Sequence, residues 1–474
     1  MMFRRFSTSR AERFDALYPF FPEMRALFRE TAESILDRTV DTGSNKTGRR
    51  VGVELEFSCM TREGEPLDED TRNALVQKYP SYQYELGAAQ IEIMTPPIDI
   101  TVAGGFGQLR NAIRSETSLL RSRVGAVGAS IVRLGSDPLV HADQRGRSKR
   151  AKDRYVLVPD FHRRHRRDGL PTFIGRDGGL IRCDHAAGLG MMSSVQYNLD
   201  CHSSEEALQL LNLALVSGPY AVAMGANARF VDGVDSGYAD IRGIVWEFSH
   251  DIRTPGEVSR GLSGRTGLPT GYFHTLEAYF EDLHDQPSIL HIPEAAFPLA
   301  TGLYWRDARI KFLRIGESDP QIVLEFRPLS IQPTSLEDYA MVAFAVGHVI
   351  GARAADIPLL PMPLLHDNRW SAMTLGMDGK LWQMTEGEPV RLSARDVMKR
   401  QTQLAENGMC ELGASSEEID QVREIWKDRS VFGSPSDIAF RSLRQMWGER
   451  SIGNKPIDRD LFRQYFLTYK DEDI

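Results

Sequence analysis

Cysteine is scarce in this sequence, which has four cysteines among 474 residues and no C-x-x-C pair. Cysteines so far apart exclude a disulfide framework and a thiolate zinc site, and they indicate a reducing compartment. With its 42% of apolar residues, the chain can bury a large core as a globular protein. The four cysteines are Cys59, Cys183, Cys201 and Cys410.

Long hydrophobic runs are also missing. The longest apolar stretch, 208–228, contains Gln209, Asn212, Ser217 and Pro219, so it is shorter than the roughly 20 apolar residues of a membrane span. We expect a buried helix with a break there. The N-terminal "MMFRRFSTSRAERF" has the Arg and Ser of a transit peptide, but acidic residues follow quickly. These features predict a cytoplasmic protein without a membrane partner.

Positive charge is in deficit, with a net charge of −8 and a pI near 5.8. Such a balance disfavours nucleic acid as a partner. The exception is the basic segment 144–168. It could be a solvated loop, a lid or contact for ATP, or a nucleic-acid site whose binding salt would weaken. No Gly-rich phosphate motif lies at a strand–helix junction, which excludes a P-loop or Rossmann site.

The pattern of elements predicts an α+β fold with a largely antiparallel curved sheet flanked by helices, because its strands do not alternate regularly with helices. We expect an N-terminal helical segment at 1–45, a catalytic domain at 46–380 and a C-terminal helical region at 381–474. Pro22 is expected to kink or split the first helical segment. The main strands are expected near 50–58, 84–97, 129–138, 192–200 and 321–330, and the main helices within 10–40, 106–124, 203–228, 333–351 and 415–426.

Four of these strands carry polar groups on one face and apolar groups on the other. In "VGVELEF", Glu54 and Glu56 lie on the face opposite Val53 and Leu55, although like charges so close repel each other. Each strand alone could turn this face to water. Together they indicate one shared polar surface. Its other members are Gln90 and Glu92, then Ser194, Gln196, Asn198 and Asp200, then Glu325 and Arg327.

A cavity lined by so many carboxylates is electrostatically unstable unless cations balance it. Oxygen ligands without cysteine indicate Mg²⁺ or Mn²⁺. Carboxylate-held Mg²⁺ beside basic side chains is the usual arrangement for nucleotide phosphates. The residues alone therefore predict a Mg-nucleotide enzyme on an antiparallel sheet. The carboxylates concerned are Glu54, Glu56, Glu85, Glu92 and Glu325.

Six motifs in order resemble glutamate–cysteine ligase family 2, the plant and proteobacterial glutamate–cysteine ligases and related carboxylate–amine ligases. The resemblance covers roughly residues 50–380. It implies a glutamine-synthetase-like sheet that forms a funnel, with ATP at one end, the amino acid at the other and two or three Mg²⁺ ions between. The motifs are "VGVELEF", "YELGAAQIEIMTPP", "MMSSVQYNLD", "GANARFVDGVDSGYADIRGIVW", "VLEFRPLSIQPTS" and "DNRWSAMTLGMDG".

The resemblance also implies roles for individual residues. Glu54 and Glu56 would hold separate metals. Glu85 and Glu92 would bind metal from the far side, and Gln196 and Glu325 would bind metal from the nucleotide side. Arg327 would lie against the transferred phosphate, and Arg242 would grip the acceptor glutamate. Further substrate or ATP contacts are expected from Trp246, Asn198, Arg309, Lys311 and the pair Arg154–Tyr155.

The implied reaction joins the γ-carboxylate of glutamate to the amine of cysteine through γ-glutamyl phosphate, as in glutathione biosynthesis, by a monomer or homodimer. The segment "WEFSHDIRTPGE" (246–257) departs from the Trp-x-x-x-Asp-x-x-Arg-Thr-Gly pattern, and "EFRPLSIQPTS" lacks an acidic residue that many carboxylate–amine ligases carry. Two alternatives therefore stay open. One is a ligase that joins glutamate or another acid to a different amine, and the other is a non-catalytic nucleotide- or metal-binding protein on the same scaffold.

Overall fold

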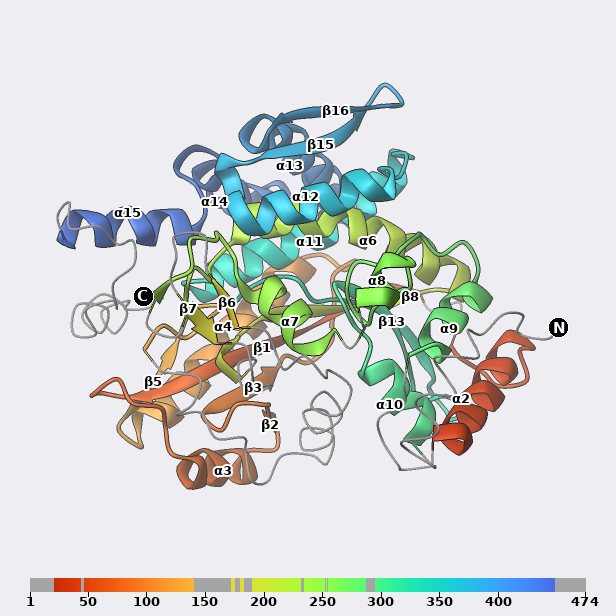
Figure 1. Ribbon diagram of the computed structural model, residues 1–474, viewed down its shortest axis with the longest axis horizontal. Helices are drawn as coiled ribbons and strands as arrows, with labels where there is room; N and C mark the ends of the chain where they lie inside the picture. Colours follow the sequence, from red (N-terminus) through yellow and green to blue (C-terminus); the bar gives the residue numbers. More distant parts are fainter. Residues whose placement is uncertain are drawn as a thin grey trace.

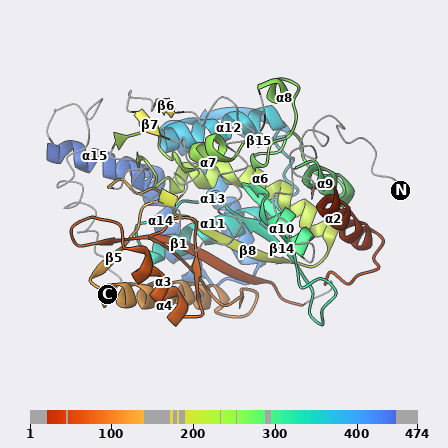
Figure 2. The ribbon, with the colours of Figure 1, turned by 60° about the horizontal axis from the view of Figure 1, so that its bottom comes forward.

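The computed structural model describes residues 21–43, 47–139, 172–174, 180–182, 190–231, 234–251, 253, 255–286 and 295–447. A curved sheet runs through the middle of the molecule, with helices on both sides and at one end (Figure 1). In both views α12 and β15 lie on the side opposite α3, and α2 contacts α9 and α10 at one end (Figure 2). The basic segment 144–168 lies outside the described residues.

The central sheet has eight strands, and every pair in it is antiparallel. Six form a row in the order β13-β14-β8-β1-β3-β2, and β4 and β5 also pair with β1. The strands of this sheet are β1 (Arg50–Thr61), β2 (Tyr82–Tyr84), β3 (Gln90–Met94), β4 (Ile98–Asp99), β5 (Ala129–Val132), β8 (Val195–Cys201), β13 (Ala308–Leu313) and β14 (Gln321–Phe326).

Within the described residues, four two-stranded pairs accompany the central sheet. They are β6 (Thr172–Ile174) with β7 (Leu180–Arg182), β9 (Phe230–Val231) with β10 (Val234–Asp235), β11 (Thr266–Gly267) with β12 (Trp305–Arg306), and β15 (Lys380–Thr385) with β16 (Glu388–Ser393). The β11–β12 pair is parallel. The α+β class and the largely antiparallel curved sheet that the sequence predicts are confirmed.

Helices cover the apolar face of the sheet. α6 packs on β13 and β14, α11 on β8, and α4 on β1 and β3. The helices are α2 (Phe21–Leu36), α3 (Glu69–Lys78), α4 (Gly105–Gly125), α6 (Ser204–Gly225), α7 (Arg242–His250), α8 (Pro255–Ser259), α9 (Leu276–His284), α10 (Ala296–Gly302), α11 (Ser335–Ala354), α12 (Met362–Leu375), the 3₁₀ turn η3 (Gly376–Asp378), α13 (Ala394–Glu411), α14 (Ser416–Phe432) and α15 (Pro435–Trp447).

The core lies between this face and the helices. Val53, Leu55, Tyr197 and Leu324 are almost wholly buried there. α6 is apolar and long enough to cross a membrane, but 89% of its apolar window is buried inside the protein. Burial in the core explains its composition without a membrane.

Glycines let α11 and α13 cross at close range. A Cβ on Gly351 would lie 1.9 Å from the Leu404 carbonyl oxygen, and a Cβ on Gly408 would lie 1.9 Å from that of Gly347. No side chain fits at such a distance. This crossing joins the C-terminal helices to the core helix α11.

Pro22 lies in the first turn of α2, where its missing N–H costs nothing. The part of the expected segment before Phe21 lies outside the described residues, so a kink or split at Pro22 stays a prediction. Two other local predictions are wrong. Pro219 lies inside α6, but the helix continues to Gly225 without the expected break. The region after 380 begins with the β15–β16 hairpin before its helices, because Gly387 provides the positive φ of its turn.

Candidate active site

Strand pairing brings the predicted polar residues onto one face of the sheet. Glu56 of β1 lies opposite Glu92 of β3, and Glu54 lies opposite Gln196 of β8. Directly opposed residues in an antiparallel pair point to the same face. In the same way, Asn198 of β8 lies opposite Glu325 of β14, and Glu325 lies opposite Arg309 of β13. The polar surface that the sequence predicts is therefore continuous across five strands.

One end of this polar face, which we call the carboxylate end, consists of Glu56, Glu85 and Glu92. An oxygen from each of the three lies within 4.8 Å of the others. Burial, followed by repulsion from Glu85, raises the pKa of Glu56 to about 7. The same two causes raise the pKa of Glu92 well above its usual range. The carboxylate end holds more negative charge than its surroundings balance.

Strand β8 and the residue before it support Glu56 through hydrogen bonds. Its carboxylate accepts hydrogen bonds from the Ser194 backbone N–H at 3.0 Å and from Gln196 Nε2 at 2.8 Å. The buried Oε1 atom of Gln196 has no hydrogen-bond partner among the described residues. Three carboxylates and a buried amide oxygen are the hard oxygen donors that Mg²⁺ and Mn²⁺ prefer. These residues fit the divalent cation that the family implies.

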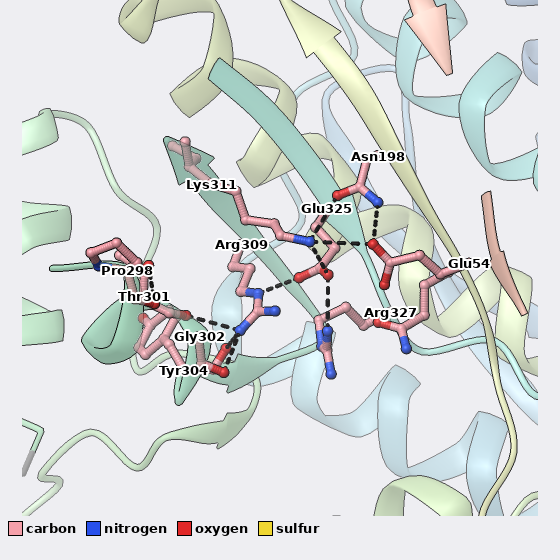
Figure 3. A network of polar contacts seen from close by, with 12 residues as sticks. Glu54, Asn198, Pro298, Thr301, Gly302, Tyr304, Arg309, Lys311, Glu325 and Arg327 are labelled. Atoms are coloured by element: carbon pink, nitrogen blue, oxygen red, sulfur yellow. Dashed lines mark hydrogen bonds and ion pairs between the residues drawn. The ribbon is translucent and has the colours of Figure 1, made fainter. Parts of the chain in front are cut away.

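The other end, which we call the cation-paired end, surrounds Glu325 with basic groups (Figure 3). Arg309 donates through Nε to one oxygen of Glu325. The other oxygen lies 2.8 Å from Lys311 Nζ and 3.1 Å from Arg327 Nη1. Burial alone would raise the pKa of Glu325, but these three cations hold it well below its usual range.

Further polar contacts complete the cation-paired end. Lys311 Nζ lies 3.3 Å from Glu54 and 3.1 Å from the Asn198 side-chain oxygen, while Asn198 Nδ2 donates to Glu54 at 2.7 Å. The Arg309 guanidinium is fixed by three backbone carbonyls at the end of α10. Those carbonyls belong to Thr301, Gly302 and Tyr304 (Figure 3).

A pocket adjoins the cation-paired end beside α7. Arg242, the first residue of α7, is buried and donates to the Arg327 carbonyl oxygen at 3.0 Å. Arg242 and Arg327 both act electrostatically on Glu56. The pocket is also lined by Trp246, Trp305 and Asp307. It combines four arginines, an aromatic wall and two carboxylates next to the polar face.

Sequence reasoning missed two groups of supporting residues. Arg72 of α3 is fully buried and donates to the carbonyl oxygens of Gly87 and Gln90, so it fixes the loop that carries Glu85. Arg369 of α12 pairs with Asp307 at the pocket and also with Glu247 of α7. Neither arginine carries a local signal, because both lie on helices whose burial depends on tertiary contacts.

The structure brings together every predicted metal and catalytic residue that it describes. Asn198, Arg309 and Lys311 lie at the cation-paired end, and Trp246 lies at the pocket. Asp200 lies away from the metal candidates and accepts from Arg50 Nε at 2.7 Å at the strand end. Arg154 and Tyr155 lie outside the described residues. The roles assigned to these side chains stay predictions.

A sequence model of glutamate–cysteine ligase family 2 matches residues 50–452. Among the relatives, a protein provisionally named glutamate–cysteine ligase 2-1 from Paenarthrobacter aurescens is 22% identical over 321 residues, which is 67% of this chain and 68% of that protein. Glutamate–cysteine ligase EgtA from Mycobacterium tuberculosis is 28% identical over 212 residues, 42% of each chain. The chain thus matches less than half the length of EgtA.

Two solved structures have a similar fold at low identity. The glutamate–cysteine ligase of Francisella tularensis, in complex with AMP, aligns with a TM-score of 0.52 at 14% identity, over 91% of each chain. A bifunctional glutathione synthetase from Pasteurella multocida aligns with a TM-score of 0.51 at 12% identity, over 94% of this chain and 54% of its own. At these identities the likeness shows the fold.

Proposed function

The chain belongs to glutamate–cysteine ligase family 2, a family of ligases, and we propose that it joins the γ-carboxylate of glutamate to the amine of cysteine at the expense of ATP. Family and fold support a carboxylate–amine ligase. The observation that carries the proposal is the polar face itself, which places three carboxylates at one end and three cations around Glu325 at the other.

The first step is phosphoryl transfer. A carboxylate is a poor electrophile, so a γ-carboxylate oxygen of glutamate attacks the γ-phosphorus of ATP, and ADP leaves with the bridging oxygen. Arg327 and Lys311, both paired to Glu325, face the region where that negative charge gathers. Catalysis of this kind depends mainly on positioning and on electrostatic stabilisation by fixed positive groups.

The second step is amide formation. The amine attacks the acyl carbon of γ-glutamyl phosphate, loses a proton and expels inorganic phosphate. Arg242 lies in the pocket beside Arg327, where its guanidinium suits the α-carboxylate of glutamate. The acyl phosphate must be kept from water, so a closing lid is expected.

The proposal includes two sites for divalent cations. Glu56, Glu85 and Glu92 would hold one Mg²⁺, and Glu54, Gln196 and Glu325 would hold another. When bound, these ions would neutralise the phosphate oxygens and orient them for in-line transfer. The number of ions, the monomeric or dimeric state and a cytoplasmic location stay predictions.

A second candidate is a ligase of the same chemistry that uses another amine. The pocket has the aromatic wall of Trp246 and Trp305, whose ring centroids lie 5.6 Å apart. The His250 ring contacts both, tilted against Trp246 and edge-on to Trp305. The segment that departs from the family pattern starts at Trp246. An acceptor larger than cysteine would meet this wall first.

The test is ADP release with Mg²⁺, ATP and glutamate across a panel of amines, with mass spectrometry of the products. Cysteine-dependent release with γ-glutamylcysteine formed would establish the proposal. Release with another amine alone would keep the chemistry and change the substrate. No release with any amine or acid, together with ATP binding, would favour a non-catalytic binding protein.

A further inference from the structure

Lys311 occupies the centre of the cation-paired end. Its ammonium nitrogen lies within 3.3 Å of oxygens from three strands: Glu54 on β1, Asn198 on β8 and Glu325 on β14. Two carboxylate oxygens and one amide oxygen that converge on a point are also a ligand set for a small hard cation. Lys311 therefore occupies Glu54 and Glu325, which are two of the three residues proposed to hold the second Mg²⁺.

We propose that Lys311 is a built-in competitor for this metal, which a divalent cation must displace from Glu54 and Glu325. The inference rests on the proposed function, because it requires a cation to bind between these two carboxylates. An ammonium and a divalent cation cannot share the same oxygens, since two positive charges a few ångströms apart repel strongly. Metal binding at this end is thereby weakened.

The other two cations around Glu325 are not placed to compete. Arg309 is anchored by three backbone carbonyls and contacts the Glu325 oxygen that Lys311 does not touch. Arg327 contacts Glu325 but neither Glu54 nor Asn198 in the structure. Lys311 has a flexible four-carbon stem, and about a quarter of its side chain is exposed. Of the three cations, it is the one that can leave.

Displacement also links the metal to the nucleotide. An ammonium released from Glu54 and Glu325 stays on β13 at the edge of the polar face, where phosphate oxygens of ATP would be its nearest new partners. Metal loading at the cation-paired end would thus free a positive charge for the phosphates. The two ends should bind metal with different affinities, the carboxylate end more tightly.

The experiment is a Mn²⁺ titration of the full-length, metal-stripped protein without nucleotide, with free Mn²⁺ measured by electron paramagnetic resonance. Wild type should show a tight and a weak class of sites. Lys311→Met should tighten the weak class at least about tenfold, which corresponds to Lys311 holding the site about nine-tenths of the time. The tight class should change less than about twofold. Lys311→Arg, which keeps the charge, should resemble wild type.

Lys399→Met is the matched control, because Lys399 is an exposed lysine of α13 paired only with Asp396. If Lys311→Met unfolds by thermal melting, Lys311→Gln tests the same loss of charge with a hydrogen-bonding side chain. Unchanged or weaker Mn²⁺ binding in the folded variant overturns the inference and leaves the proposed function standing. A wild type that binds no Mn²⁺ overturns the inference and also removes the metal from the proposed function.

Discussion

The carboxylate end and the cation-paired end lie on the same sheet face, yet they treat a buried glutamate in opposite ways. At the carboxylate end, burial and the neighbouring Glu85 raise the pKa of Glu56 to about 7. At the cation-paired end, Arg309, Arg327 and Lys311 hold the pKa of Glu325 well below its usual range despite complete burial. At the first end, burial and repulsion outweigh the attraction of Arg242 and Arg327 for Glu56. At the second end, the attraction of three cations outweighs the burial of Glu325.

This contrast shows how one sheet can prepare two cation sites of different character. Carboxylates that repel one another destabilise the folded chain. A bound cation removes this repulsion, so metal binding should stabilise the carboxylate end most. Groups already paired within the protein stabilise the fold and give up an internal partner when metal binds. We expect the first end to depend on metal and the second to depend on its arginines and lysine.

The largest effect expected is on stability. Glu325→Gln leaves Arg309, Arg327 and Lys311 without their shared carboxylate, so the free energy of unfolding should fall by about 3–5 kcal/mol. Denaturant unfolding in chelator buffer measures it. The matched change Glu92→Gln should alter the same quantity by less than about 1 kcal/mol, because its raised pKa already favours the neutral form. Equal losses for both variants would abolish the contrast.

The next effect is on turnover. Glu56→Gln should keep the fold and lower kcat/KM for ADP release by at least about a hundredfold, because it removes a metal ligand from the carboxylate end. Melting temperature in chelator should match or exceed that of wild type, since one repelling charge is gone. Unchanged turnover in the folded variant would contradict the assignment of Glu56 to a metal.

Metal addition gives a smaller shift. Free Mg²⁺ at tenfold its Kd should stabilise the wild type by about 1.4 kcal/mol through binding to the folded state alone. The same addition should stabilise Glu56→Gln much less. Differential scanning fluorimetry with and without chelator measures both, with Ca²⁺ as a comparison ion. A shift of equal size in the two proteins would place the metal away from Glu56.

The smallest effect concerns the support of Glu85. Arg72→Lys keeps the charge but cannot hold both carbonyls of the loop that carries Glu85, so Mn²⁺ affinity at the tight sites should fall by a few-fold, at most about tenfold. Mn²⁺ titration gives the readout, and Lys78→Arg, in the last turn of the same helix, serves as control. Unaltered affinity would limit Arg72 to a purely structural role.

Much of the site could be predicted because strand periodicity is a local signal. Glu54, Glu56, Gln196, Asn198 and Glu325 alternate with buried apolar residues, so their shared face follows from a period of two residues. The resemblance to the family added an expected role for each of these residues. The helix expected at 415–426 was likewise predictable, and in the structure Ser415 and Glu418 form a capping box at its start.

Other features could not be read from the chain because they depend on which segments meet. α6 continues past Pro219 because it packs against α11 and against β13 and β14 of the sheet. This packing offsets the one backbone hydrogen bond that proline cannot make. Arg72 and Arg369 look like ordinary helix surface residues in the sequence. Only packing buries them against Gly87, Gln90 and Asp307.

The sequence by itself determined the α+β class, the polar face and the surplus of carboxylates on it, because alternation and composition are properties of neighbouring residues. Tertiary structure alone decided how that charge is shared. Pairing β13 with β14 placed Arg309 opposite Glu325, and Lys311 reached across to Glu54 more than 250 positions away in the chain. The balance of charge in a site depends on distances in space, which local patterns do not contain.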